Sequence, residues 1–128
     1  MELINPDSLA RPAGFSHGVK ATGTLLAVAG QVGWDKTSRI VAEGFVVQFS
    51  RSLENVLEVV RAAGGGPPNL IRLAIYVTVK DEYLASLKPL GAEYRRIMGQ
   101  HYPAMTLVEV KGLLEPGAKV EIEALAVL

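Results

Sequence analysis

A long apolar stripe that ends in a run of glycine and proline is the feature that most constrains the fold. Apolar side chains recur at three- and four-residue steps over residues 43–63, which predicts an amphipathic α-helix. Residues 64–68, three glycines and two prolines, follow at once. Glycine accepts a left-handed cap and proline cannot continue a helix, so we interpret this run as a helix stop. It is not a phosphate-binding loop, because it follows a helix instead of preceding one.

Apolar and β-branched runs on both sides of this helix predict strands. Before it, residues 15–21 and 24–30 are separated by the turn-like pair Thr22-Gly23, which predicts a hairpin. After it, residues 70–79 have the composition of a central strand. The remaining predicted strands are residues 105–110, residues 119–127 and a short first strand over residues 2–4.

A second apolar stripe predicts another helix, which Asp81 would cap at its start and Gly99 at its end. Pro89 interrupts the stripe. A proline inside a helix removes a hydrogen bond and costs on the order of 3 kcal/mol. We therefore expect the regular helix to begin near Pro89, with residues 83–88 forming a looser first turn or a kink.

The predicted order, β-β-α-β-α-β-β, describes an α/β (α+β) fold with one mixed sheet. Two right-handed crossovers place both helices on the same face of that sheet. The length of 128 residues fits a single domain over residues 1–128. One helix layer leaves the other sheet face uncovered, and an apolar face must be buried by something else. A second copy of the chain is the obvious candidate, so we expect an oligomer.

Charge and cysteine content exclude several classes of function. Lys+Arg and Asp+Glu both number 13, so the net charge is zero, and the missing basic excess counts against nucleic acid as a partner. The chain has no cysteine, which excludes disulfides, thiolate zinc sites and a cysteine nucleophile. No apolar run approaches the roughly 20 residues of a membrane span, and the first residues lack a signal-peptide pattern. We expect a cytoplasmic protein without a membrane partner.

The sequence holds no conventional set of catalytic or metal-binding residues. His17 and His101 lie far apart, and neither has a second ligand at metal spacing. We expect His17 to make ordinary hydrogen bonds and His101 to cap the second helix, where a cation is favoured. We expect neither a metal nor a cofactor.

Carboxylates in the last strand are a stronger chemical signal. Two-residue periodicity puts Glu121 and Glu123 on one face of the strand with Leu125 and Val127. A carboxylate that loses its hydration among apolar side chains becomes usable as a general acid or base near neutrality. The alternative is a solvated face or a cross-strand ion pair, and spacing alone favours that structural role.

Several segments carry a resemblance to a known family. They are Gly30-Gln31 and residues 52–56, 62–64, 102–110 and 120–127. With them the chain strongly resembles the Rid/YjgF family, also labelled endoribonuclease L-PSP, nearly from end to end. The resemblance implies a chorismate-mutase-like homotrimer with small-molecule clefts at its subunit interfaces. It also implies hydrolysis of enamines and imines, such as 2-aminoacrylate.

The family's site residues transfer only in part. The resemblance implies an arginine after the Pro-Ala pair that clamps the substrate carboxylate through two parallel hydrogen bonds, and Met105 stands at that position. Glu121 is the one catalytic-type residue kept, and it would position water or shuttle protons. Phe15 stands where a tyrosine is common, and Gly91 where an asparagine is expected. The remaining implied substrate-binding residues are Gly30, Gln31 and Leu107.

These substitutions leave three functions open. The first is hydrolytic deamination of an enamine or imine other than a simple 2-imino acid, with Glu121 activating water. Losing one charge-assisted anchor costs about 1.5–3 kcal/mol, which disfavours small imino acids. The second is a non-catalytic module that binds a small metabolite, and the third and weakest is RNA cleavage. The argument that Glu121 lies alone in a cleft that has lost its cation fails if this acid lies in bulk water, or if Arg72, Arg95 or Arg96 reaches into the cleft instead.

Overall fold

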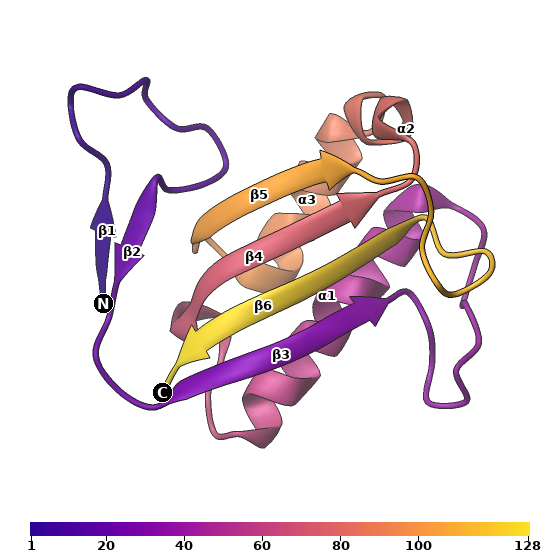
Figure 1. The fold of residues 1–128 in the computed structure, drawn as a ribbon, viewed down its shortest axis with the longest axis horizontal. Helices are drawn as coiled ribbons and strands as arrows, with labels where there is room; N and C mark the ends of the chain where they lie inside the picture. Colours follow the sequence, from indigo (N-terminus) through magenta and orange to yellow (C-terminus); the bar gives the residue numbers. More distant parts are fainter.

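A four-stranded sheet with helices packed against one of its faces forms the main body of the protein (Figure 1). The computed structural model describes residues 1–128. Along the chain the elements are β1 (Glu2–Ile4), β2 (Gly18–Lys20), β3 (Leu25–Val32), α1 (Phe45–Ala62), the 3-10 turn η1 (Pro67–Asn69), β4 (Leu70–Val77), α2 (Lys80–Leu84), α3 (Leu87–Met98), β5 (Ala104–Glu109) and β6 (Val120–Val127).

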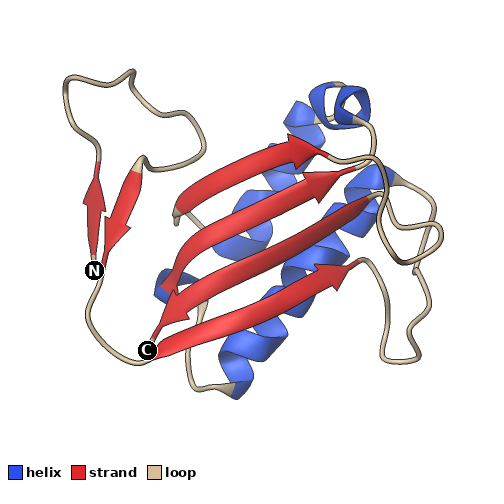
Figure 2. Cartoon of the chain, viewed as in Figure 1, coloured by secondary structure: helices blue, strands red, loops and turns tan.

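The sheet is mixed and runs in the order β3-β6-β4-β5. Strands β4 and β5 are parallel, whereas β6 is antiparallel to both of its neighbours. Figure 2 shows all helices on one side of this sheet and the opposite side open. The predicted mixed sheet with helices on one face is confirmed. The second predicted helix is divided into two, so three α-helices are present.

The predicted hairpin between residues 15–21 and 24–30 is wrong. Strand β2 pairs with β1, with Leu3 opposite Val19, and β3 pairs with β6 instead. Thr24 exchanges two backbone hydrogen bonds of 2.9 Å with Leu128, which ties the start of β3 to the end of the chain. Strand composition predicts that a segment is extended but not which distant strand completes its hydrogen bonds, and here β6 takes that place.

Gly23 owes its place to close backbone packing and not to a hairpin turn. Its φ is +149°, and a Cβ there would overlap the carbonyl oxygen of Leu128 and lie 2.9 Å from Val127 Cγ1. We predict that Gly23→Ala lowers the free energy of unfolding by more than about 1 kcal/mol, because the backbone conformation and the space both exclude a side chain. Urea unfolding measures the effect. Gly112→Ala, where a Cβ meets nothing within 4 Å, is the control; equal losses in both variants contradict the prediction.

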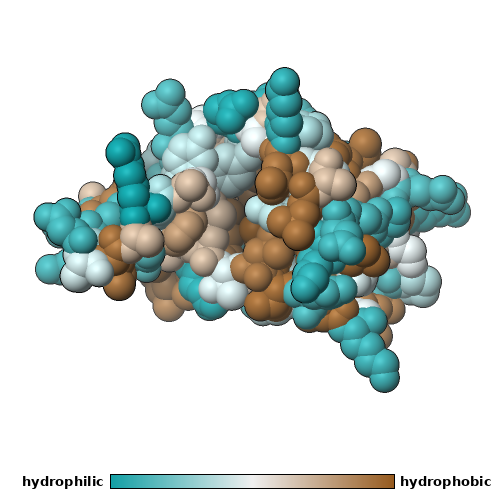
Figure 3. All heavy atoms as spheres, turned by 90° about the horizontal axis from the view of Figure 1, so that it is seen from above, coloured by the Kyte–Doolittle hydropathy of each residue, from teal (hydrophilic) through white to brown (hydrophobic).

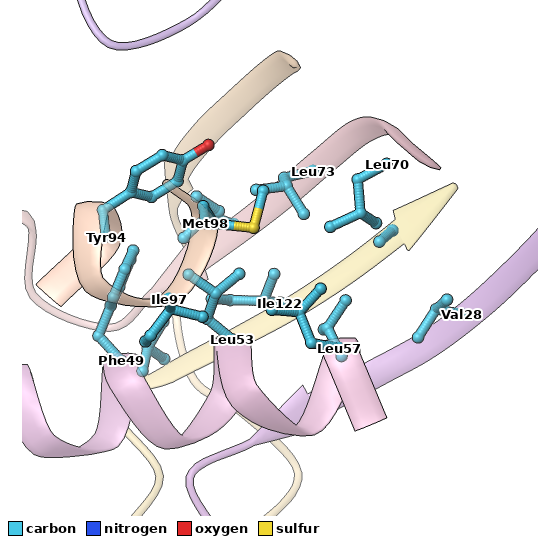
Figure 4. Close-up of a cluster of buried hydrophobic side chains, with 14 of the residues drawn as sticks. Val28, Phe49, Leu53, Leu57, Leu70, Leu73, Tyr94, Ile97, Met98 and Ile122 are labelled. Carbon is cyan, nitrogen blue, oxygen red and sulfur yellow. The ribbon is translucent and has the colours of Figure 1, made fainter. Parts of the chain in front are cut away.

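Helix α1 supplies the centre of the core. Its apolar stripe, predicted over residues 43–63, forms the helix Phe45–Ala62 and packs on β3 and β6. Leu53, Val56, Leu57 and Val60 are fully buried in a cluster of 19 hydrophobic residues. Figure 4 shows side chains of α1, α3 and the sheet meeting in this cluster. The amphipathic stripe therefore fixes which face of the sheet is covered.

The break predicted near Pro89 is confirmed. Helix α2 ends at Leu84, and α3 begins at Leu87 with Pro89 in its first turn, where its missing N–H group disrupts no helical hydrogen bond. Gly99 ends α3 with a φ of 66°, as expected. The predicted N-cap is wrong: Val79 takes that place and Asp81 lies within α2, because the helix starts directly after β4.

The open face of the sheet carries alternating side chains. Along β6 the even-numbered residues are buried under the helices, whereas Glu121 and Glu123 are half-buried on the other face, as predicted. That face also exposes apolar side chains, with Leu25 at 62% and Val108 at 42%. No helix is long and apolar enough to span a membrane.

Candidate functional site

A cleft of about 510 Å³ lies where β5, α2, α3 and the loop before β2 meet. A smaller hollow of about 250 Å³ continues it, and the two share five lining residues. The elements around the cleft lie uppermost in Figure 1; seen from above, Figure 3 shows hydrophobic side chains gathered in the middle and hydrophilic ones toward both ends. Four of the residues predicted from the sequence line this combined cleft: Phe15, Gly91, Met105 and Leu107.

Parallel pairing of β5 with β4 aims two of these residues into the cleft. Met105 lies opposite Leu73 and Leu107 opposite Ile75, and both partners belong to the core beneath the helices. Residues paired across neighbouring strands share a face. Met105 and Leu107 therefore project toward the helix side of the sheet.

The N-terminal segment brings Phe15 to the same place. Ser16 forms a bridge with Ala104, its N–H donates to the carbonyl of Pro103 at 3.1 Å, and its Oγ donates to that of Tyr102 at 2.6 Å. These bonds fasten the segment to the beginning of β5. Phe15 is thereby held at the mouth of the smaller hollow.

Two stacked tyrosines form one wall of the cleft. The rings of Tyr94 and Tyr102 lie 5.1 Å apart between centroids and are inclined by 13°. The Tyr94 hydroxyl donates to the carbonyl of His101 at 2.6 Å, and burial raises the pKa of Tyr94 well above its usual value. Tyr94 therefore stays neutral and offers an aromatic surface instead of an acid or a base.

Arg95 is the one charged residue that lines the cleft, and sequence reasoning did not place it there. Its side chain makes neither an ion pair nor a hydrogen bond with the protein, whereas Arg96 donates to Glu93 and Glu54. The expectation of a cleft without a guanidinium is therefore wrong. The spacing of Gly91 and Arg95 was the available signal, since residues four apart share a helix face.

Gly91 makes room for this guanidinium. A Cβ at position 91 would lie 3.3 Å from Arg95 Nη1, closer than most side chains approach one another. A Cβ at position 91 would shift the exposed end of the Arg95 side chain by a few tenths of an ångström, so glycine leaves this side chain in its position.

Glu121 lies on the other face of the sheet. It pairs with Tyr76 of β4 on the open face, whereas Met105 faces the helices. Within one chain Glu121 therefore does not meet Phe15, Met105 and Leu107, and the implied cleft at a subunit interface stays a prediction. Alternation along β6 predicts which residues share a face with Glu121 on that strand. It does not predict whether Met105, on another strand, lies on the same face of the sheet.

Gly30 belongs with Glu121. A bulge interrupts the β3–β6 register between Val28 and Gln31, and a Cβ at Gly30 would lie 2.8 Å from Glu121 Cδ. Only glycine leaves the carboxylate its space there. The Gln31 amide donates to the carbonyl of Ala29 at 3.2 Å. The predicted site residues thus form two groups, one in the cleft and one on the open face.

Neighbouring carboxylates on the open face differ in their partners. Glu123 accepts a hydrogen bond from the Tyr76 hydroxyl, and this bond raises the pKa of Tyr76. Glu121 has no hydrogen bond or ion pair with the protein. Glu123 therefore has a structural partner, although this partner is the Tyr76 hydroxyl and not the cation of a cross-strand ion pair. Glu121 is the carboxylate without a partner in its own chain.

Both histidines are engaged with the backbone. His17 Nε2 lies 2.6 Å from the carbonyl oxygen of Ala10, as expected for an ordinary hydrogen bond. His101 Nε2 lies 2.7 Å from that of Leu70, so the prediction that it caps the second helix is wrong. Neither ring lines the cleft.

Comparison with known proteins gives a consistent result. The family described as Endoribonuclease L-PSP matches residues 6–128. A RutC family protein of Pyrococcus horikoshii is 33% identical over 127 residues, covering 98% of this chain and 96% of that protein. A 2-iminobutanoate/2-iminopropanoate deaminase of Salmonella typhimurium is 34% identical over 108 residues, covering 82% and 80%.

Solved structures agree with these sequence matches. The Rid family protein YyfB of Yersinia pestis has a TM-score of 0.87 at 33% identity, with 99% of this chain and 98% of that chain covered. E. coli TdcF, solved with bound serine, has a TM-score of 0.72 at 27% identity, with 97% and 91% covered.

Proposed function

Because this chain belongs to the Rid/YjgF (endoribonuclease L-PSP) family, we propose that it hydrolyses an enamine or imine to a carbonyl compound and ammonia. Its relative from Salmonella typhimurium is named a deaminase of 2-iminobutanoate and 2-iminopropanoate. The observation that carries the proposal is that the chain has both a cleft and, on the opposite face of the same sheet, a carboxylate without a partner, that of Glu121.

The site is completed by a second copy of the chain. Glu121 and Met105 lie on opposite faces of one sheet, so a pocket that contains both side chains needs two subunits. The apolar residues exposed on the open face, Leu25 and Val108 among them, support burial of that face in an oligomer. We take this oligomer to be a homotrimer with three equivalent clefts.

In such a cleft Glu121 acts as the general base and then as the acid. Its carboxylate accepts a proton from water as the oxygen attacks the C=N carbon, and it returns this proton to the nitrogen, which gives a carbinolamine. The remaining hydroxyl proton then passes through the carboxylate to the nitrogen as the C–N bond breaks, so that a carbonyl compound and ammonia leave. Met105 offers no hydrogen-bond donor, so a small 2-imino acid would lack an anchor beside the reacting carbon. The preferred substrates are therefore bulkier and more apolar.

A coupled assay tests this function. An amino-acid oxidase generates imines from several amino acids, and the release of ammonia is followed with and without the protein. We expect faster hydrolysis of imines with large apolar side chains than of 2-iminopropanoate. If no imine decays faster while an apolar metabolite raises the melting temperature, the protein is a binding module. RNA cleavage is disfavoured by the zero net charge and by the backbone contacts of both histidines.

A further inference from the structure

We propose that Arg95 binds a carboxylate of the ligand within the larger part of the cleft, so that the ligand is a monoanion with an aromatic or branched apolar body. The inference names the substrate class of the proposed imine hydrolase and in that respect rests on the proposed function. The recognition of the carboxylate itself requires no turnover.

The first support is a guanidinium without a protein acceptor. On α3 the neighbouring Arg96 donates to Glu93 at 2.8 Å and to Glu54 at 2.7 Å, and Glu93 also accepts from Ser50 at 2.9 Å. The carboxylate adjacent in the helix is thus already engaged toward α1. Arg95 keeps its donors for a ligand, and a guanidinium binds a carboxylate through two parallel hydrogen bonds.

The second support is the composition of the cleft. Nine of its 12 lining residues are hydrophobic, and Arg95 is the only charged one. Arg95 is solvent-exposed and brings a single positive charge to an otherwise apolar cleft. One such charge matches one negative charge, whereas a phosphate dianion requires more donors. The stacked rings of Tyr94 and Tyr102 offer a flat surface to an aromatic or branched body.

The third support is the division of the cleft. Arg95 and Gly91 line the larger part, Phe15 and Leu107 line the smaller part, and Met105 lines both. A carboxylate held by Arg95 therefore belongs to the part of the cleft away from Phe15. The apolar body then extends past Met105, the position where a directly attached carboxylate finds no donor.

Binding of matched acid and amide probes tests the proposal. Calorimetry measures 3-phenylpropanoate against 3-phenylpropanamide, and 4-methylpentanoate against its amide, on the full-length protein. We expect the wild-type protein to prefer each acid by roughly tenfold to a hundredfold. Arg95→Met abolishes the preference, and Arg95→Lys retains part of it because an ammonium is a point charge. Arg61→Met, an exposed arginine at the far end of α1, leaves the preference unchanged.

Equal affinity of the wild-type protein for acid and amide, including no measurable binding of either at millimolar concentration, overturns the proposal. So does a preference that survives in Arg95→Met. An acidic residue of a second subunit that neutralises Arg95 would produce the first of these results. Acid preference without hydrolysis of any imine supports the carboxylate site while rejecting the enzymatic function.

Discussion

Glu121→Gln is expected to lower kcat for imine hydrolysis by about 10²- to 10⁴-fold, the contribution of a positioned general base or acid. Glutamine keeps the size of the side chain but cannot accept the proton of the attacking water. Since the Glu121 carboxylate makes no hydrogen bond or ion pair within its own chain, its loss leaves the fold intact. The coupled imine assay measures the activity, and thermal unfolding checks the fold.

Glu123→Gln is the matched control, because it alters the next carboxylate on the same face of β6. Glu123 accepts a hydrogen bond from Tyr76, which an amide oxygen also accepts, so we expect activity within a few-fold of wild type. Full activity of Glu121→Gln, or equal losses in both variants, removes the assigned base.

Leu53→Ala is expected to lower the free energy of unfolding by about 2–5 kcal/mol. Leu53 has no solvent exposure and lies at the centre of α1, between α3 and the sheet. Truncation leaves a cavity that the surrounding side chains fill only in part. Because α1 packs against both the sheet and α3, this core holds the cleft and the strand of Glu121 in one body.

Urea unfolding measures this loss against Val47→Ala on the same helix. Val47 is 50% exposed, so we expect its truncation to change stability by no more than about 0.5 kcal/mol. Similar effects of the two substitutions would mean that the buried stripe of α1 is not the source of the stability.

Local features of the sequence predicted the elements that depend on local physics. The glycine-proline run ended α1, Pro89 marked the start of a new helix, and alternation along β6 separated the face of Glu121 from that of Val120 and Ile122. Each of these three features follows from a backbone restriction or from the period of the side chains along the chain. None of them requires knowledge of which distant segments pack together.

Contacts between segments that are far apart in the chain could not be predicted from the sequence patterns. Strand β2 pairs with β1, and β3 pairs with β6, about 100 residues later in the chain. The sequence also left undetermined which side of the sheet Met105 faces, because β5 carries apolar side chains on both of its faces. Only the pairing with β4 decides between the two sides. The separation of Met105 from Glu121 within one chain was therefore not visible before the fold was known.

The structure also shows how far the roles of the family's site residues can be carried over to this chain. The position after the Pro-Ala pair is Met105, and the guanidinium at the cleft comes from α3 instead. Met105 brings no charge to the cleft, whereas Arg95 brings one from α3, next to Gly91. Site chemistry has to be taken from the cleft as folded and not from one aligned position.

Subunit complementation tests most directly whether the site is shared between two copies of the chain. Glu121→Gln removes the base, and Gly91→Phe fills the cleft, so each variant alone is expected to be inactive. Co-refolded in equal amounts, they form mixed oligomers in which about one site in four combines an open cleft with an intact base, and about a quarter of the wild-type activity returns. If native mass spectrometry shows mixed oligomers and no activity returns, or shows only monomers, the shared site is contradicted.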